Sequence, residues 1–364
     1  MIQACPYALN RKDSVGRFLV RPPMRSDEPA QPCAIYSPTD PLFGLAVVGR
    51  TPAGLVFPVR LDHPLAEGGI GVVYAAWSLT DGRPVAVKVL QERHAGDAGI
   101  VGRFEREIRY AFRISHPNLV AALAAGRLDD GRPFLVMERL EGFTLGALVR
   151  AEGPLAIERA LRLADQILAG LGALHEASIV HRDLQPDNIF VAHGDRAVIL
   201  DLGFAQEPGV DTGDGVTPDS PGSLVGTLAF MAPEQATRGR AITARSDLFS
   251  VAVLVYYALS GQLPFRGQDD LAVLVSVVRA APIPLRRARR DAPTALDDLL
   301  ARALAKHPDA RFASAPEMRA ALARIGLEGG RGYDGTPKPP GLDGQPTRRA
   351  ARAPRSRRLA LHAA

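Results

Sequence analysis

Two short motifs constrain this chain more than any other feature of its sequence. Residues 181–188 read HRDLQPDN, and Asp201-Leu202-Gly203 follows them. Among the oxygen-bearing side chains that they supply, three stand out, those of Asp183, Asn188 and Asp201. The Asp183 carboxylate can orient a substrate hydroxyl and accept its proton, whereas Asn188 and Asp201 offer hard oxygen ligands for Mg²⁺. The two motifs therefore offer a candidate catalytic carboxylate and candidate ligands for Mg²⁺.

A glycine-rich turn, residues 66–73, lies between two strand signals. Gly68, Gly69 and Gly71 would let backbone N–H groups approach phosphate oxygens, where a Cβ would intrude. The turn is not a P-loop, because no Gly-Lys-Ser/Thr follows and a strand comes next. Taken alone it is a weak signal, and an ordinary β-turn is the plainer alternative.

Lys88 ends the apolar segment Val85-Ala86-Val87-Lys88 that follows the turn. An ammonium group buried in an apolar strand needs an anionic partner, because an unpaired buried charge is expensive. Glu105 and Glu107 both lie in the next helical segment, where they point in different directions. The spacing favours Glu107 as the partner, and the alternative is that Glu107 is one charge on a solvated helix face.

The order of strand and helix signals indicates an α+β protein with two lobes. Apolar runs bounded by turn residues predict strands, and apolar residues at three- and four-residue spacing predict helices. The predicted strands are residues 57–65, 71–78, 84–90, 120–128 and 133–139, and the predicted helices are residues 100–115 and 155–177. The apolar segment 248–259 is too short to span a membrane, so we expect a buried core helix there.

The chain divides into three zones by composition. Residues 1–56 mix Pro, Gly and scattered charge, and we predict a partly disordered N-terminal extension. Residues 57–326 carry the strand and helix signals and form the predicted folded domain, whereas residues 327–364 are predicted to be a disordered tail rich in Gly, Pro and Arg. From Arg331 onward the tail holds eight of the 44 Lys and Arg residues but only two of the 39 Asp and Glu residues, so the net charge of +5 belongs to the tail.

Cysteine content and hydropathy suggest a compartment. Cys5 and Cys33 are the only cysteines and cannot form a disulfide framework for a chain of 364 residues, which favours a reducing compartment. No run of about 18 or more apolar residues occurs, and the N-terminus lacks the basic and apolar regions of a signal peptide. We therefore predict a cytoplasmic protein without a membrane span.

Taken in order, the motifs resemble those of the eukaryotic-like Ser/Thr protein kinases of bacteria, over roughly residues 57–326. The resemblance begins with the glycine turn, Lys88 and Glu107, and continues through the HRDLQPDN loop and the Asp201 turn. Further landmarks in the same order are His116-Pro117-Asn118, Met137-Glu138-Arg139-Leu140, Gly226-Thr227, Ala232-Pro233-Glu234, Ser246-Asp247, Pro264-Phe265 and Arg311. One motif can arise by chance, but an ordered set of this length is highly specific.

The resemblance implies a bilobal protein-kinase-like fold, with an antiparallel sheet and one helix in the N-lobe and a mainly helical C-lobe. It implies transfer of the γ-phosphate of ATP, with Mg²⁺ or Mn²⁺, to Ser and Thr hydroxyls of proteins. The residues that it assigns to nucleotide binding are Ala66, Gly68, Gly69, Gly71, Val73, Ala86, Lys88, Met137, Glu138, Leu140, Phe190 and Asp201. Those that it assigns to catalysis are Lys88, Glu107, Asp183, Gln185, Asn188 and Thr227, with Asn188 and Asp201 as metal ligands. It also implies that Asp247 braces the catalytic loop and that Arg311 pairs with Glu234.

Three positions depart from the family pattern. Ala66 replaces the first glycine of the turn and Leu202 replaces the usual Phe, and both changes are mild. Gln185 replaces a Lys that places positive charge near the transferring phosphate, and loss of one preorganised donor costs on the order of 10² to 10³ in rate. A nucleotide-binding pseudokinase is therefore the alternative to an active kinase. A small-molecule phosphotransferase is a weaker alternative, because Ala232-Pro233-Glu234 and Thr227 indicate protein substrates.

Regulation by phosphorylation is suggested by Arg182, which directly precedes Asp183. In the family that this chain resembles, such an Arg meets a phosphate on the activation loop. The hydroxyls available in that loop are Thr212, Thr217, Ser220 and Ser223. We hypothesise autophosphorylation at one or more of them; for each one singly, the alternative is an ordinary loop hydroxyl.

The basic tail offers a second kind of partner. Its arginines could bind nucleic acid, an acidic protein or anionic lipid. It has no aromatic residues interleaved with the arginines, since Tyr333 lies upstream of the cluster. This composition favours a solvated, disordered terminus over a binding segment.

Overall fold

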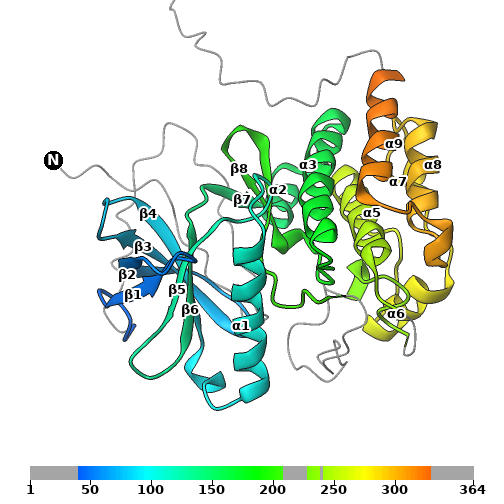
Figure 1. Ribbon diagram of the computed structural model, residues 1–364. Helices are drawn as coiled ribbons and strands as arrows, with labels where there is room; N and C mark the ends of the chain where they lie inside the picture. The colour runs from blue at the N-terminus through cyan, green and yellow to red at the C-terminus, as the bar shows by residue number, and fades with distance from the viewer. Residues whose placement is uncertain (1–39, 208–227, 238–240, 329–364) are drawn as a thin grey trace, which may run out of the picture.

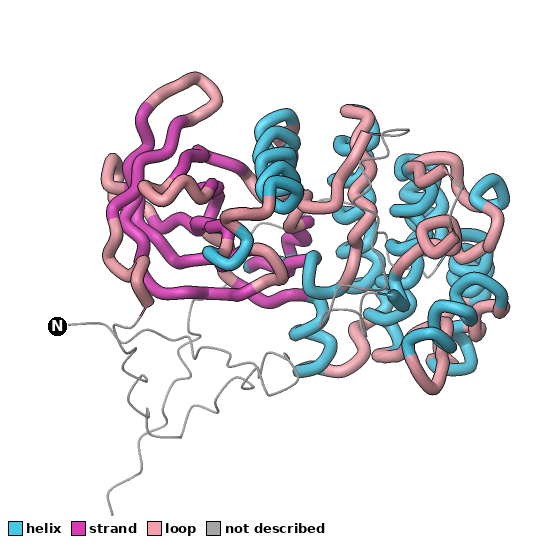
Figure 2. Tube along the Cα trace, turned by 90° about the horizontal axis from the view of Figure 1, so that it is seen from below, coloured by secondary structure: helices cyan, strands magenta, loops and turns pink. Residues whose placement is uncertain are grey.

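The computed structural model describes residues 40–207, 228–237 and 241–328. Thr227, the four predicted phosphorylation sites in the activation loop, both cysteines and the predicted tail from residue 329 onward lie outside the described residues. The described chain forms two lobes, a β-rich N-lobe and a helical C-lobe, with one long helix of the N-lobe facing the C-lobe (Figure 1). The view from below shows the same separation of strands and helices (Figure 2). The predicted α+β, bilobal fold is therefore confirmed.

The N-lobe is a closed antiparallel barrel of six strands. The strands are β1 (Ala46–Arg50), β2 (Val56–Glu67), β3 (Gly71–Ser78), β4 (Pro84–Leu90), β5 (Ala122–Arg127) and β6 (Pro133–Glu138). They are ordered β1-β2-β3-β4-β6-β5, and the pairing of Arg50 with Ala125 joins β1 to β5 and closes the barrel. The five strands predicted from the sequence correspond to β2 through β6.

Strand β1 belongs to the folded lobe although it lies within the predicted N-terminal extension, residues 1–56. It pairs with β2 over its whole length and alternates between exposed and buried residues, with Val47 and Gly49 facing inward. The folded lobe therefore begins by about residue 40 rather than at residue 57. The strand is only five residues long and is flanked by Gly and Pro, so its alternation was too short to recognise in the sequence.

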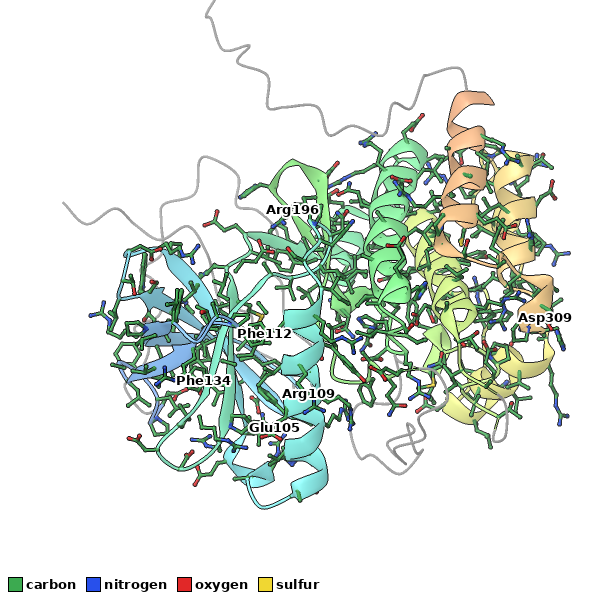
Figure 3. All side chains as sticks on the ribbon, in the orientation of Figure 1. Glu105, Arg109, Phe112, Phe134, Arg196 and Asp309 are labelled. Carbon is green, nitrogen blue, oxygen red and sulfur yellow. The ribbon has the colours of Figure 1, made fainter. Side chains whose placement is uncertain are left out.

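The interior of the barrel leaves little room where β1 and β5 meet. Phe134 is fully buried there and is one of the side chains labelled on the N-lobe (Figure 3). A Cβ built on Gly126 would lie 2.6 Å from the Phe134 ring and 2.9 Å from the carbonyl oxygen of Val48. Glycine at this position allows the barrel to close around the aromatic ring.

Helix α1 (Ala98–Arg113) packs on the sheet and carries Glu107 toward it. The Asp97 side chain caps the helix by accepting hydrogen bonds from the N–H groups of Gly99 and Ile100. Phe104 anchors the helix in an apolar cluster with Leu90 of β4 and Leu135 of β6. The helix was predicted within two residues of its observed ends.

The C-lobe consists of helices and a small three-stranded sheet. The helices are α2 (Leu145–Glu152), α3 (Ile157–Glu176), α5 (Ala244–Ser260), α6 (Asp270–Arg279), α7 (Leu285–Ala288), α8 (Thr294–Ala303) and α9 (Ala315–Glu328). The strands are β7 (Gly142–Thr144), β8 (Ile189–Ala192) and β9 (Arg196–Ile199), in the order β7-β8-β9. The catalytic loop lies between α3 and β8, and the Asp201 turn follows β9.

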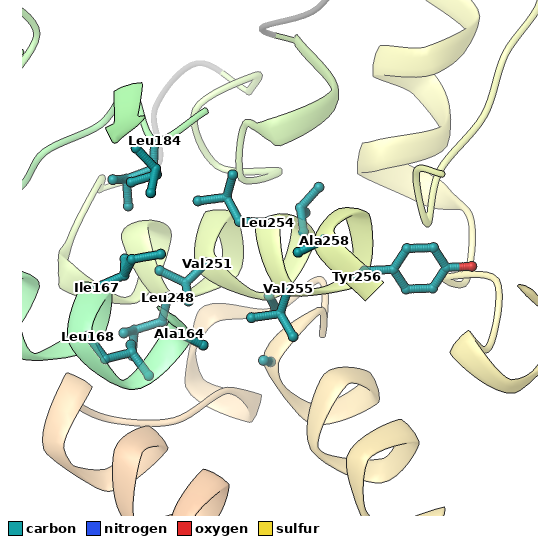
Figure 4. Packing of buried hydrophobic residues seen from close by; sticks show 14 of the residues in the cluster. Ala164, Ile167, Leu168, Leu184, Leu248, Val251, Leu254, Val255, Tyr256 and Ala258 are labelled. Carbon is teal, nitrogen blue, oxygen red and sulfur yellow. The ribbon is translucent and has the colours of Figure 1, made fainter. Parts of the chain in front are cut away.

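Helix α5 is the centre of the C-lobe core, as the apolar segment 248–259 predicted. Its side chains pack against Ile167 and Leu168 of α3 and against Leu184 of the catalytic loop (Figure 4). Fourteen of its 17 residues are buried, so its apolar character serves the interior of the lobe. Within the described part of the chain, we find no helix with the length and hydropathy needed to cross a membrane.

Candidate active site

The catalytic loop is held in place by a carboxylate from the core helix α5. Asp247 accepts hydrogen bonds from the backbone N–H groups of His181 and Arg182, each at 2.9 Å, and contacts the His175 ring nitrogen at 2.8 Å. Arg182 has a positive φ of 69°, a strained conformation that persists only when its surroundings fix it. Burial opposes the charge on Asp247, but His175, the His181 ring and the Arg182 N–H lower its pKa. The predicted brace is confirmed.

Asp183 lies at the centre of a small hydrogen-bond network. The Asn188 amide donates to the Asp183 carbonyl oxygen at 2.8 Å and to its Oδ2 at 2.9 Å. Gln185 donates to the same Oδ2 at 3.3 Å. Burial, assisted by the negative charge of Asp201, raises the pKa of Asp183 to about 7. The other carboxylate oxygen, Oδ1, receives none of these bonds and is the oxygen suited to a hydroxyl substrate.

Asp201 stands across from Asp183 at the end of β9. Its φ is 54°, and its Oδ1 accepts the Gly203 N–H at 2.8 Å while its Oδ2 lies 3.0 Å from the Lys88 ammonium. Burial opposes ionisation, but Lys88 and the Gly203 N–H lower the pKa of Asp201 to about 2. The carboxylate is therefore charged at neutral pH. Leu202, which replaces the usual Phe, is buried beside it.

Lys88 pairs with Glu107, which settles the choice between the two glutamates. The ammonium lies 2.6 Å from Glu107 Oε1, and both side chains are buried. Glu105 instead pairs with Arg127 on the surface. Burial, with the charge of Asp201, raises the pKa of Glu107 to about 7, although Lys88 opposes this. Of the three N–H groups of Lys88, two are given to Glu107 and Asp201, so one is left for a phosphate oxygen.

The glycine turn is shaped by backbone contacts and by residues after β4. Ala66 pairs with Val73 inside the ladder, and the Gly68 N–H donates to the Gly71 carbonyl at 2.8 Å. A Cβ on Gly71 would lie 3.1 Å from the Val89 carbonyl and 3.4 Å from the Lys88 side chain. The Gly69 carbonyl accepts a hydrogen bond from Arg93 at 3.1 Å. The turn is thus fixed directly beside Lys88.

The predicted adenine-binding residues come from both lobes. Ala86 of β4 pairs with Met137 of β6, and Val73 of β3 pairs with Lys88 of β4. Phe190 comes from β8 in the C-lobe, and Leu140 follows β6. The Glu138 N–H donates to the Ala121 carbonyl at 2.9 Å. An adenine contact from Glu138 would therefore have to use its carbonyl oxygen.

The donor set fits a magnesium ion shared with a phosphate ligand. Both Asn188 bonds to Asp183 use its amide nitrogen, which directs its Oδ1 elsewhere. Asp201 contributes a charged oxygen. Among the described residues no three His, Cys, Asp or Glu side chains gather into a metal site. Mg²⁺ usually binds through one or two protein oxygens and completes its shell with water and substrate phosphates, and Asn188 and Asp201 could supply two such oxygens.

Three residues of the site were not predicted from the sequence. Arg103 donates to the Gly203 carbonyl at 2.8 Å, and His175 contacts Asp247 at 2.8 Å. Gln235 donates to the Arg182 carbonyl at 2.7 Å, which ties the segment after Pro233 to the catalytic loop. Arg103 precedes Glu107 by one helical turn, and that spacing was a signal available in the sequence.

The predicted pair between Glu234 and Arg311 is present and fully buried. Two hydrogen bonds of 2.7 and 2.8 Å join the guanidinium to the two carboxylate oxygens. Ser246 also donates to Glu234 at 2.7 Å. Burial opposes the charge on Glu234, but Arg311 lowers its pKa. This pair joins the segment after the activation loop to the base of the C-lobe.

Comparisons with known proteins agree with this geometry. The family model described as protein kinase domain matches residues 60–322. The chain is 37% identical over 278 residues to the serine/threonine-protein kinase PknB of Mycolicibacterium smegmatis, covering 76% of this chain and 44% of that protein. It is 36% identical over 287 residues to the serine/threonine-protein kinase pkn3 of Myxococcus xanthus, covering 77% of this chain and 52% of that protein.

The fold is also similar to that of the PknI kinase domain of Mycobacterium tuberculosis. The TM-score is 0.56 at 24% sequence identity, and the match covers 73% of this chain and 94% of that one. At this identity the likeness concerns the fold alone. The chain spans about half the length of the two curated relatives that it matches.

Proposed function

The chain belongs to the protein kinase domain family, and from that premise we propose that it transfers the γ-phosphate of ATP to Ser and Thr hydroxyls of proteins. The observation that carries the proposal is the convergence of Lys88, Asp183 and Asp201. Lys88 pairs with both Glu107 and Asp201, and Asp183 keeps one carboxylate oxygen clear of its neighbours' hydrogen bonds. Phosphoryl transfer requires chiefly positioning and neutralisation of charge, which these groups can supply.

Each residue has a distinct part in the proposed reaction. Asp183 accepts a hydrogen bond from the substrate hydroxyl and takes its proton, and its raised pKa suits a base that works near neutral pH. Lys88 gives its third N–H to a phosphate oxygen, while Glu107 keeps the ammonium in place. Asn188 and Asp201 are the proposed ligands of Mg²⁺ or Mn²⁺, which would neutralise charge on the nucleotide phosphates. The glycine turn beside Lys88 is proposed to cover those phosphates.

The alternative of a nucleotide-binding pseudokinase depends on Gln185. Its amide donates to Asp183, so the side chain takes part in the catalytic network although it brings no charge. Lys88, Asp183, Asn188 and Asp201 are all present, and the ion pair with Glu107 is formed. We therefore favour an active enzyme whose rate is limited, at most, by the missing charge at this position.

Further proposals concern partners and regulation. We propose that proteins with Ser or Thr are the substrates and that the chain phosphorylates itself in the segment containing Thr212, Thr217, Ser220 and Ser223. A cytoplasmic location and binding of an acidic partner or nucleic acid through the tail remain predictions from composition. Binding of such a partner that weakens with salt and is lost on truncation at Gly330 would support the predicted role of the tail.

Phosphoamino-acid analysis tests the proposed specificity. The protein is incubated with Mg²⁺, γ-labelled ATP and casein, and label is expected in phosphoserine and phosphothreonine of the substrate and of the chain itself. Peptide mass spectrometry then locates the sites on the chain. Label in phosphotyrosine alone would contradict the specificity, and nucleotide binding without any transfer would favour the pseudokinase.

A further inference from the structure

Arg103 on helix α1 makes two contacts with the turn that carries Asp201. Its Nε donates to the Gly203 carbonyl oxygen at 2.8 Å. Its guanidinium carbon lies 3.3 Å from the centre of the Phe204 ring, a stacked arrangement that a planar guanidinium can adopt and an ammonium cannot. Residues 103 and 107 are one helical turn apart, so Arg103 and Glu107 share the face of α1 that is directed at the site.

The turn needs such support because its first residue is strained. Asp201 has a φ of 54°, and a non-glycine residue in this region costs about 1 kcal/mol or more unless its surroundings fix it. The Gly203 N–H fixes the turn from within, through its bond to Asp201 Oδ1. Arg103 fixes it from outside, through the carbonyl of the same glycine.

Gly203 is enclosed by the three side chains concerned. A Cβ built there would lie 2.9 Å from Asp201 Oδ1, 3.4 Å from Glu107 Oε2 and 3.6 Å from the Arg103 guanidinium. The guanidinium also interacts electrostatically with Glu107, Asp183 and Asp201. The turn is therefore packed directly against α1 as well as linked to it through Lys88.

We propose that Arg103 is a positioning residue, which holds the Asp201 turn in its metal-binding orientation through the Gly203 carbonyl oxygen and the Phe204 ring. Helix α1 then contacts the turn by two routes. One runs from Glu107 through Lys88 to the Asp201 carboxylate, and the other runs from Arg103 to the backbone of Gly203. Loss of the Arg103 side chain removes the second route and leaves the first in place. This inference rests on the proposed function only in assigning Asp201 as a metal ligand.

The test compares two substitutions of Arg103 with a matched control. Arg103→Met keeps the length of the side chain but removes the donor and the charge, and Arg103→Lys keeps the charge but removes the planar group. Arg109→Met is the control, because Arg109 is exposed on the same helix (Figure 3) and makes no hydrogen bond or ion pair within the described residues. Thermal unfolding establishes that each variant is folded.

The first measurement needs no nucleotide. Hydrogen exchange of the backbone amides of residues 201–204 should be faster in Arg103→Met than in the parent, and unchanged in Arg109→Met. The second measurement is the Mg²⁺ concentration that half-saturates binding of a non-hydrolysable ATP analogue. We expect it to rise about tenfold or more in Arg103→Met, as for other groups that orient a metal ligand, and by less in Arg103→Lys.

The two measurements separate this inference from the proposed function. Parent-like exchange and parent-like Mg²⁺ dependence in Arg103→Met would overturn the positioning role. If that variant does not fold, Arg103→Lys decides, and parent-like values in it would overturn the role in the same way. Neither measurement uses phosphate transfer. An inactive parent would therefore refute the proposed kinase activity, but hydrogen exchange and Mg²⁺ dependence would still test the role of Arg103.

Discussion

Removal of Arg311 should destabilise the C-lobe through the carboxylate that it leaves behind. The side chains of Arg311 and Glu234 have no solvent exposure, and two short hydrogen bonds join them. Breaking a buried pair by removing one partner costs about 3–5 kcal/mol, because the remaining charge is uncompensated. For a domain of this size, 1 kcal/mol lowers Tm by roughly 2–4 °C, so Arg311→Met should lower Tm by roughly 6–20 °C.

The matched control is Arg302→Met, which removes the exposed pair between Arg302 and Glu317. Exposed pairs contribute about 1 kcal/mol or less, so Tm should fall by no more than about 4 °C. Differential scanning calorimetry of both variants at pH 7 gives the comparison. A fall in Arg311→Met no larger than that in Arg302→Met would refute the reasoning.

The pH dependence of Tm in Arg311→Met tests whether the destabilisation comes from the charge on Glu234. Burial opposes the charge on Glu234, but Arg311 lowers its pKa in the folded parent, so the pair stabilises the fold above the unfolded pKa of about 4.3 and loses this effect as pH falls through the folded value. Without Arg311, burial should raise the pKa of Glu234. The Tm difference between parent and Arg311→Met should therefore shrink as pH is lowered from 7 toward 5, and a difference that grows would contradict this assignment.

Three further outcomes follow from the geometry. Glu107→Gln should reduce phosphate transfer at least about 10²-fold, because it removes the anion that holds Lys88, whereas Glu105→Gln should stay close to the parent; equal rates in steady-state assays would contradict the pairing. Gln185→Lys should raise kcat, by up to about 10²-fold, since it adds charge where only an amide is present, and an unchanged kcat would mean that Gln185 is an adequate substitute. Gly126→Ala should destabilise the N-lobe by about 1–3 kcal/mol through overpacking against Phe134, measured by thermal unfolding, and an unchanged Tm would show that the barrel can relax there.

Much of the fold could be predicted because strand and helix periods were strong and in a recognisable order. The strands β2 to β6 and the helices α1 and α3 carry long apolar patterns, and α5 is mostly apolar from Leu248 onward. Strand β1 was missed because five residues give too few alternations to distinguish a strand from a loop. Closure of the barrel depends on the contact between Arg50 and Ala125, and no local pattern encodes such a long-range pairing.

Most of the candidate site could also be predicted, because its residues lie in short motifs of the sequence. Lys88, Asp183 and Asp201 lie in motifs with fixed local spacing, and the choice of Glu107 over Glu105 followed from spacing along the chain. Arg103, by contrast, acts on a carbonyl a hundred residues away in sequence. Its role depends on how α1 packs, and tertiary packing of this kind is not written in any single motif.

The most direct test of the account is to measure transfer and binding together in Asp183→Asn. The claim is that Asp183 acts on the hydroxyl, whereas Lys88, Asn188 and Asp201 hold the nucleotide and its metal. Single-turnover transfer from γ-labelled ATP should therefore fall by at least about 10²-fold, while the Kd for Mg–ATP stays within about threefold of the parent, a difference of less than 1 kcal/mol. Transfer at the parental rate in this variant, or a parent that binds Mg–ATP and transfers nothing, would contradict the account.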